Sequence, residues 1–250
     1  MPKRHLKKAA AKMLASNANS RFTPEEQRVM AEPHSPECFL VCCIDSRFQP
    51  AKALGYGPGI ALEYRQIACA VPPEASAGPD LMARMAFRRL NNIDSIVLVT
   101  HSDCGGAQAA LKVPQPDFNG DDDLHAVAAV VHRTGLNIPV LGADFMQAEE
   151  GSLRKAGDRL ARAVGVKAFN NLMGYKGREG FATIADEVKS GALDVKLLHY
   201  DLEKQSFEIY SAVQGKWEPK PEGERILKKI AKSSQACAHE TRRAAVKAGK

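Results

Sequence analysis

Continuous apolar runs alternate along this chain with segments of helical periodicity. The run CFLVCCI at 38–44 is short and bounded by polar residues, which is typical of a strand buried on both faces of a parallel sheet. DSIVLVTH at 94–101 has the same character, and IALEYRQIACAV at 60–71 follows the turn GYGPG. A helix is predicted at 79–92, between the strands at 60–71 and 94–101. This order of strand, strand, helix and strand predicts parallel βαβ construction.

Amphipathic periodicity predicts helices around these runs. In PDLMARMAFRRLNN at 79–92, apolar residues recur at three- and four-residue spacing. The same reasoning predicts helices at 4–17, 23–31, 121–134, 152–166 and 178–190, and in the basic segment after residue 224. The segment 194–213 alternates about a polar turn and predicts an antiparallel hairpin, whereas 113–123 contains two prolines and a glycine and predicts a loop.

These elements together predict an α/β fold. We expect a central, mostly parallel β-sheet flanked by helices, with a C-terminal hairpin and an N-terminal helical arm. The chain divides accordingly into a basic helical arm at 1–35, the main α/β domain at 36–215 and a basic helical tail at 216–250.

The composition is that of an ordinary soluble globular protein, with 250 residues, 44% hydrophobic and 26% charged. No apolar stretch approaches the roughly 20 residues that span a bilayer. The N-terminus has no apolar run long enough for a secretory signal, so we expect a cytoplasmic location. A basic segment with no acid before Glu25 is also a feature of organelle transit peptides, and that alternative stays open.

The positive net charge of +6 belongs to the two ends of the chain. Residues 1–24 carry six Lys and Arg and no acid, residues 224–250 carry a net +6, and the remaining body is therefore −6. Such basic tails can contact anionic polymers, including nucleic acid, or membranes. A solvated helix face is the more ordinary interpretation, and we favour it.

The candidate chemistry begins at the carboxyl ends of two predicted strands. His101 ends one strand, Cys104 follows three residues later, and Gly105 and Gly106 open a predicted helix. The helix dipole stabilises a thiolate at that position, and the glycines let backbone N–H groups approach a ligand. Cys43 ends the other strand, and open α/β sheets bind ligands beyond these strand ends.

If the two strands are neighbours, Cys43, His101 and Cys104 converge. Two thiolates and one imidazole suit Zn²⁺, and three protein ligands leave a fourth position open, as catalytic zinc requires. Cys42 points to the opposite strand face and is interpreted as core. The other histidines, His125, His132 and His199, have no second ligand at a suitable spacing, and we expect them on helix or hairpin surfaces.

Asp45 and Arg47 follow Cys43 closely, in the sequence CIDSR. Because two thiolates balance the charge of a zinc ion, such a site acidifies water less than an all-histidine site, and a nearby helper becomes useful. Asp45 can accept a hydrogen bond from zinc-bound hydroxide. Arg47 can hold Asp45 ionised through a charge-assisted pair.

These residues carry a resemblance. CIDSR at 43–47 and HSDCGG at 101–106 resemble the C-x-D-S-R and H-x-x-C-G-G motifs of the beta-class carbonic anhydrases. The segment GYGPGIALEYRQIACAV is similar to the P-G-x-x-x-x-x-R-N-x-A-N stretch of that family, and the hairpin containing YDLEKQSFEIY resembles its closing strands.

The resemblance implies a zinc enzyme that interconverts CO₂ and bicarbonate. It implies Zn²⁺ on Cys43, His101 and Cys104 and an Asp45–Arg47 catalytic dyad. In some family members the aspartate takes the fourth zinc position in a closed, inactive form, so that either Asp45 or water is the expected fourth ligand. It also implies a homodimer or a dimer of dimers in which N-terminal helices lie over the partner.

Departures from the family pattern leave alternatives open. Both asparagines are lost, at Gln66 and Cys69, and Gly57 stands where some members have a glutamine. A second hypothesis is therefore a COS or CS₂ hydrolase on the same fold. A third is a non-catalytic zinc-binding relative whose basic tails bind an anionic partner.

Overall fold

Six strands form one mixed sheet in the computed structural model, which describes residues 22–32, 35–113, 122–176 and 180–218. The strands are β1 (Cys38–Cys43), β2 (Ala61–Gln66), β3 (Ser95–His101), β4 (Asp194–Asp201), β5 (Ser206–Ser211) and β6 (Lys216–Glu218), in the spatial order β2-β1-β3-β4-β5-β6. Strands β2, β1, β3 and β4 are parallel, and β5 and β6 add antiparallel pairs. The predicted α/β fold with its C-terminal hairpin is confirmed.

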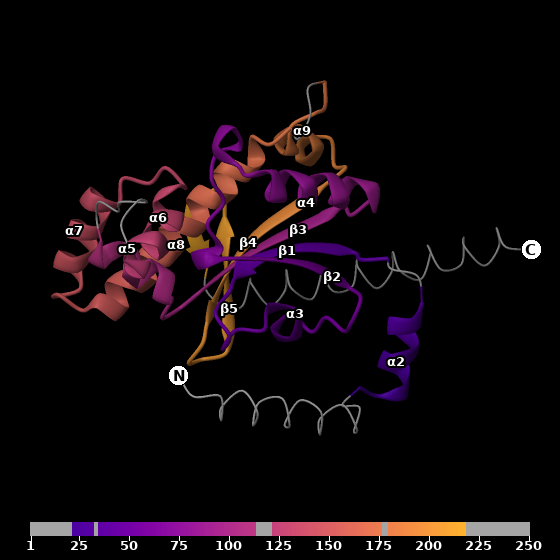
Figure 1. Ribbon diagram of the computed structural model, residues 1–250, viewed down its shortest axis with the longest axis horizontal. Helices are drawn as coiled ribbons and strands as arrows, with labels where there is room; N and C mark the ends of the chain where they lie inside the picture. The colour runs from indigo at the N-terminus through magenta and orange to yellow at the C-terminus, as the bar shows by residue number, and fades with distance from the viewer. Residues whose placement is uncertain (1–21, 33–34, 114–121, 177–179, 219–250) are drawn as a thin grey trace, which may run out of the picture.

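Most helices pack against the sheet or its end, whereas α2 lies apart from it with no buried residue (Figure 1). The helices are α2 (Pro24–Ala31), α3 (Pro50–Ala53), α4 (Pro79–Leu90), α5 (Gly105–Lys112), α6 (Asp123–His132), α7 (Ile138–Ala148), α8 (Leu153–Met173) and α9 (Ile184–Lys189), with 3₁₀ turns at Ile67–Cys69 and Glu74–Ser76. Thr23 caps α2 and forms a capping box with Glu26.

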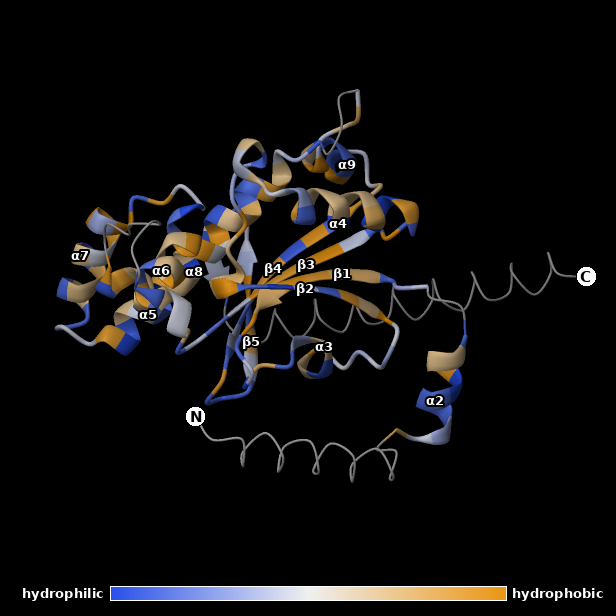
Figure 2. Cartoon of the chain, viewed as in Figure 1, coloured by the Kyte–Doolittle hydropathy of each residue, from blue (hydrophilic) through white to orange (hydrophobic). Residues whose placement is uncertain are grey.

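The two faces of the sheet are covered differently. Helices α4, α8 and α9 cover one face, and the short helix α3 with its flanking loops lies on the other (Figure 1). Every residue of β1 is buried, and hydrophobic colour concentrates on the central strands (Figure 2). This double covering explains the continuous apolar run at 38–43, whereas Ile44 lies beyond the end of β1 and is 54% exposed.

A third buried cluster lies at one end of the sheet, beyond the carboxyl end of β1. Helices α5, α6, α7 and α8 gather there (Figure 1), and their small and aliphatic side chains enclose Cys43 and Cys104. The last residue of β1 and the residue before α5 are therefore buried among helices rather than exposed to solvent.

The structure corrects two sequence expectations. The strand expected at 60–71 ends at Gln66, because Ala68 and Cys69 take left-handed backbone angles, with φ of 53° and 59°. His199, expected at the surface, is 1% exposed on β4, where its Nδ1 lies 2.9 Å from Thr100 Oγ1. It is buried because β4 is an interior strand, paired on both sides.

The structure describes only part of the N-terminal arm predicted at 1–35 and of the C-terminal tail predicted at 216–250. The last strand, β6, continues the sheet past the boundary expected at residue 215. The predicted helices at 4–17 and after residue 224 lie outside the described residues, so the arm and the tail stay predictions. Among the described residues, no helix combines the length and the apolar character needed to cross a membrane.

Candidate metal centre

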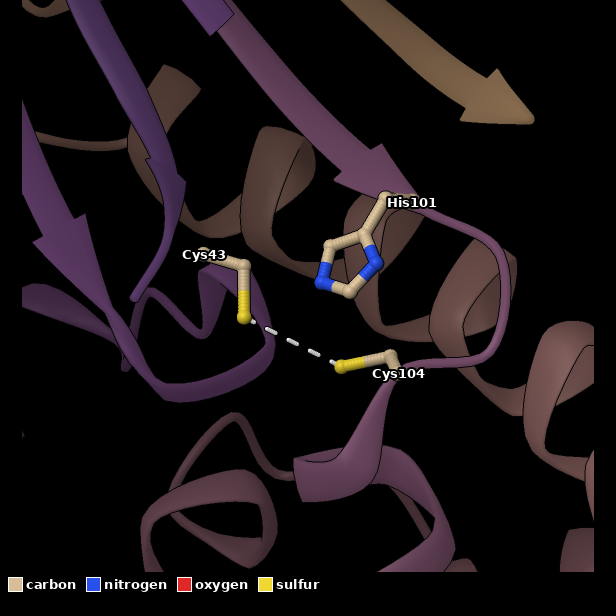
Figure 3. A group of neighbouring side chains, drawn as sticks. All are labelled: Cys43, His101 and Cys104. Atoms are coloured by element: carbon tan, nitrogen blue, oxygen red, sulfur yellow. Dashed lines mark hydrogen bonds between the residues drawn. The ribbon is translucent and has the colours of Figure 1, made fainter. Parts of the chain in front are cut away.

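Three potential metal ligands come together at the carboxyl edge of the sheet (Figure 3). Cys43 is the last residue of β1, His101 is the last residue of β3, and Cys104 directly precedes α5. Their ligand atoms all lie within 4.8 Å of one another, and the two sulfur atoms are 3.9 Å apart. They meet because β1 and β3 are neighbouring parallel strands, which is the condition on which their predicted convergence depended.

The His101 ring is oriented to offer one nitrogen to a ligand. Its Nδ1 lies 2.8 Å from the carbonyl oxygen of Ser102, which can only accept a hydrogen bond, so Nδ1 carries the proton. Its Nε2 is buried and has no hydrogen-bond partner. A buried polar atom without a partner is costly, and here it lies beside two thiols. This donor set fits a zinc ion.

The two thiols differ in acidity. The hydrogen bond with Cys104 is the main cause that lowers the pKa of Cys43 below its usual value, and the nearby His101 adds to it against the opposing effect of burial. The same hydrogen bond and burial raise the pKa of Cys104 well above its usual value. In the absence of a cation, one thiolate is thus stabilised at the expense of the other, because two adjacent negative charges repel.

Helix α5 begins close to the 3₁₀ turn that follows β2. A Cβ atom on Gly106 would lie 2.6 Å from Ile67 Cγ2 and 3.4 Å from the backbone nitrogen of Ala68. Only glycine permits this approach, which places the first turn of α5, and hence Cys104, against the sheet edge.

A substitution tests this packing. Gly106→Ala is expected to lower the free energy of unfolding by about 1–3 kcal/mol, because the added methyl group overpacks against the Ile67 side chain, whose Cγ2 would lie 2.6 Å away. Thermal unfolding followed by circular dichroism should show a Tm lower by roughly 2–10 °C. Gly105→Ala is the matched control, since a Cβ there meets nothing within 4 Å. Equal Tm values for the two variants would contradict this account.

Asp45 and Arg47 lie on the turn after β1 and form a bidentate pair. Asp45 Oδ1 accepts hydrogen bonds from Arg47 N at 2.9 Å and Nε at 3.1 Å, and Asp45 Oδ2 accepts one from Nη2 at 2.8 Å. The hydrogen bonds from the Arg47 side chain are the main cause that lowers the pKa of Asp45, to about 2. Asp45 Oδ2 lies 3.9 Å from His101 Nε2, beside the three ligands but not among them.

Several residues around this centre were not anticipated from the sequence. Asp103 accepts a hydrogen bond from Arg47 Nη1 at 2.9 Å. Arg65 on β2 donates to the carbonyl oxygen of Phe48 at 3.1 Å and so fixes the turn that carries Asp45. The buried Phe48 ring lies 5.7 Å from the His101 ring, between centroids. Asp103 stands between two ligands in HSDC, the one sequence signal that pointed to it.

The remaining thiols near the centre face elsewhere. Cys42 is fully buried on the opposite side of β1, as predicted, where its sulfur atom lies 3.9 Å from the carbonyl oxygen of Tyr64. Cys69 donates to the carbonyl oxygen of Val41 at 3.4 Å and packs into the core under α4 and α8. Among the residues that the structure describes, only the Cys43, His101 and Cys104 group has the geometry of a metal site.

Comparison with known proteins shows the family and the fold. The family model described as carbonic anhydrase matches residues 38–207. This match covers most of the chain, and the chain belongs to the beta-class carbonic anhydrase family.

Two curated relatives come from Arabidopsis thaliana. Beta carbonic anhydrase 5, chloroplastic, is 26% identical over 216 residues, covering 82% of this chain and 64% of the relative. Beta carbonic anhydrase 6, mitochondrial, is 30% identical over 94 residues, covering 36% of this chain and 32% of the relative. The chain therefore spans less than two thirds of the length of these relatives.

Solved structures of beta-carbonic anhydrases share the fold. CcaA gives a TM-score of 0.66 at 18% identity, covering 85% of this chain and 98% of its own. CafA of the fungal pathogen Aspergillus fumigatus gives 0.60 at 23% identity, covering 93% and 98%. A tetrameric enzyme from Sordaria macrospora gives 0.58 at 21% identity, covering 84% and 95%.

Proposed function

We propose that this protein is a zinc-dependent carbonic anhydrase that interconverts CO₂ and bicarbonate. The observation that supports this most directly is the meeting of two thiols and an unpartnered imidazole nitrogen beside an ion-paired aspartate. A structural zinc site has no use for such an aspartate, whereas hydration of CO₂ needs an acceptor for a proton next to the nucleophile.

Three atoms would hold the zinc ion: the sulfur atoms of Cys43 and Cys104 and Nε2 of His101. When bound, zinc supplies Lewis acidity that makes water a nucleophile near neutral pH. The carbonyl oxygen of Ser102 holds the proton on His101 Nδ1 and keeps Nε2 available as a ligand.

Asp45 would orient the attacking water. Its pKa of about 2 keeps the carboxylate ionised throughout the working range, and its Oδ2 can accept a hydrogen bond from the water. Arg47 fixes the direction of that carboxylate through the bidentate pair. Buried apolar side chains next to the ligands, Ala68 in the cluster around Cys43 and Cys104 and Phe48 beside the His101 ring, limit the access of bulk water.

The catalytic segment and the oligomeric state are part of the same proposal. We propose that 36–215 carries the catalytic centre, and that the chain forms a homodimer or a dimer of dimers, which the tetrameric Sordaria macrospora relative supports. Asp45 as a fourth zinc ligand stays a prediction, as does cytoplasmic location, since the curated relatives are named as chloroplastic and mitochondrial proteins.

The direct test measures metal content and CO₂ hydration on the same protein. We expect about one zinc ion per chain and stopped-flow hydration well above buffer between about pH 7 and 9, the range in which zinc would make water a nucleophile at a site with two thiolates. Zinc removal by a chelator should abolish the rate, and added zinc should restore it. A zinc-loaded protein with no hydration above buffer at any of these pH values would overturn the proposal in favour of a non-catalytic relative.

Hydrolysis of COS or CS₂ is a second candidate, motivated by Gln66 and Cys69 in place of two family asparagines. The structure weakens it, because the Cys69 thiol faces the core and Gln66 accepts a hydrogen bond from Ile67 N at 3.1 Å. Sulfide release from COS or CS₂ without CO₂ hydration would favour this candidate over the first.

A further inference from the structure

Asp103 connects the metal ligands to the Asp45–Arg47 pair. It lies in the short turn between His101 and Cys104, and its backbone is left-handed, with φ of 54°. The carboxylate Oδ2 accepts from Arg47 Nη1 at 2.9 Å, and the Asp103 carbonyl oxygen accepts from Arg47 Nη2 at 2.9 Å. The guanidinium is therefore held from two sides, by Asp45 and by Asp103.

Asp103 is itself anchored by two helices. Its backbone N–H donates to Asp158 Oδ1 on α8 at 2.5 Å, and its Oδ1 accepts from Gln108 Nε2 on α5 at 2.9 Å. Arg154 Nε on α8 lies 3.8 Å from the same oxygen. These contacts fix both the backbone and the carboxylate, so Asp103 can act as a rigid support for Arg47.

Arg47 needs such a support. Its side chain is 51% exposed, whereas that of Asp45 is 14% exposed. An exposed arginine samples many rotamers, and a single surface ion pair is worth little against that entropy. Two carboxylates and a carbonyl oxygen together restrain the guanidinium far more than Asp45 alone.

We propose that Asp103 is a positioning residue for the reaction. By holding the Nη1–Nη2 edge of Arg47, next to the Nε–Nη2 edge that binds Asp45, it sets the direction in which the guanidinium presents its donors to Asp45. It thereby keeps Asp45 Oδ2 beside the metal ligands, at 3.9 Å from His101 Nε2. This inference rests on the proposed function for its kinetic part, while its geometric part concerns only Asp103, Arg47 and Asp45.

The competing interpretation is that Asp103 only stabilises its turn, since aspartate tolerates left-handed backbone angles. Two variants separate the roles. Asp103→Asn keeps the shape but removes the charge, and Asp103→Gly accepts the left-handed backbone without strain while removing the carboxylate. Asp80→Asn is the control, because Asp80 forms an exposed ion pair with Arg84 at 3.1 Å on α4.

Kinetics on the zinc-loaded full chain gives the first measurement. Both Asp103 variants should keep the zinc content of the unmodified protein and lose kcat on the order of tenfold, the scale of a lost supporting contact. In an Arg47→Lys background, Asp103→Asn should have little further effect, because the two residues act as a unit. Asp80→Asn should retain the full rate. A full rate in both Asp103 variants, or an equal loss in the Arg47→Lys background, would overturn the proposal.

Nuclear magnetic resonance gives a measurement that is independent of activity. In the unmodified chain the Arg47 guanidinium should give separate Nη–H signals, because its clamped state rotates slowly, and Arg47→Lys identifies them. These signals should merge or vanish in Asp103→Gly and persist in Asp80→Asn. Unchanged signals in Asp103→Gly would overturn the proposal. An inactive unmodified protein that shows the expected signals would refute the proposed function and leave the clamp in place.

Discussion

Cys104→Ser protein is expected to fold and to lose most of its zinc. A serine hydroxyl is not ionised near neutral pH and is a poor zinc ligand, so the centre would keep one thiolate and one imidazole. If a zinc ion held by four ligands is worth about 10–16 kcal/mol, one thiolate accounts for roughly 3 kcal/mol, or an affinity loss on the order of 10²–10³. Elemental analysis after dialysis against a zinc buffer, together with competitive titration, measures this loss.

A neighbouring thiol provides the matched control. Cys42 directly precedes Cys43 in β1, and it is equally buried, but its sulfur atom lies against the carbonyl oxygen of Tyr64 on the opposite strand face. Cys42→Ser keeps a donor for that carbonyl and should bind zinc as the unmodified protein does. Circular dichroism confirms that both variants are folded. Retention of one tightly bound zinc by Cys104→Ser would show that the metal is held elsewhere.

The central strands of this fold were predictable because a strand buried on both faces appears in the sequence as a continuous apolar run. The run CFLVCCI has no polar position, and β1 is buried along its whole length between two parallel neighbours. The end of β2 was not predictable in the same way. The sequence IALEYRQIACAV stays apolar beyond Gln66. Its residue types do not indicate that the backbone of Ala68 and Cys69 adopts positive φ angles.

Helix α7 could not be predicted from the pattern of apolar and polar residues alone. Ile138–Ala148 contains Pro139 and Gly142, which usually argue against a helix interior. Pro139 is tolerated in the first turn, where no backbone donor is needed, and a Cβ on Gly142 would lie 2.9 Å from Leu111 on α5. Tertiary packing, rather than local propensity, therefore decides this element.

The three candidate metal ligands were predictable because the topology alone brings them together. Once β1 and β3 are parallel neighbours, the residues at their ends share one edge of the sheet. Asp103 and Arg65 depend instead on side-chain directions across that edge, which no periodicity encodes. His199 was misjudged because its burial depends on the pairing of β4 with β5, a contact between strands rather than a property of its own segment.

Asp45→Asn is expected to keep zinc and lose most of the catalytic rate. The substitution preserves the shape of the side chain, and asparagine Oδ1 can still accept from Arg47 N and Nε. The amide nitrogen that replaces Oδ2 cannot accept a hydrogen bond from Arg47 Nη2 or from the attacking water. We expect kcat to fall on the order of 10²–10³-fold, the usual cost of removing a group that handles a proton or orients charge in the transition state.

The measurement distinguishes chemistry from metal loss. Stopped-flow hydration is recorded on Asp45→Asn, on the unmodified chain and on Asp80→Asn, each with zinc quantified in the same sample. Because Arg47 holds the pKa of Asp45 at about 2, the carboxylate is ionised at every assay pH, and the loss in Asp45→Asn should be nearly constant between about pH 7 and 9. A full rate would remove Asp45 from the mechanism. A loss of zinc equal to the loss of rate would make Asp45 a residue of the metal shell instead.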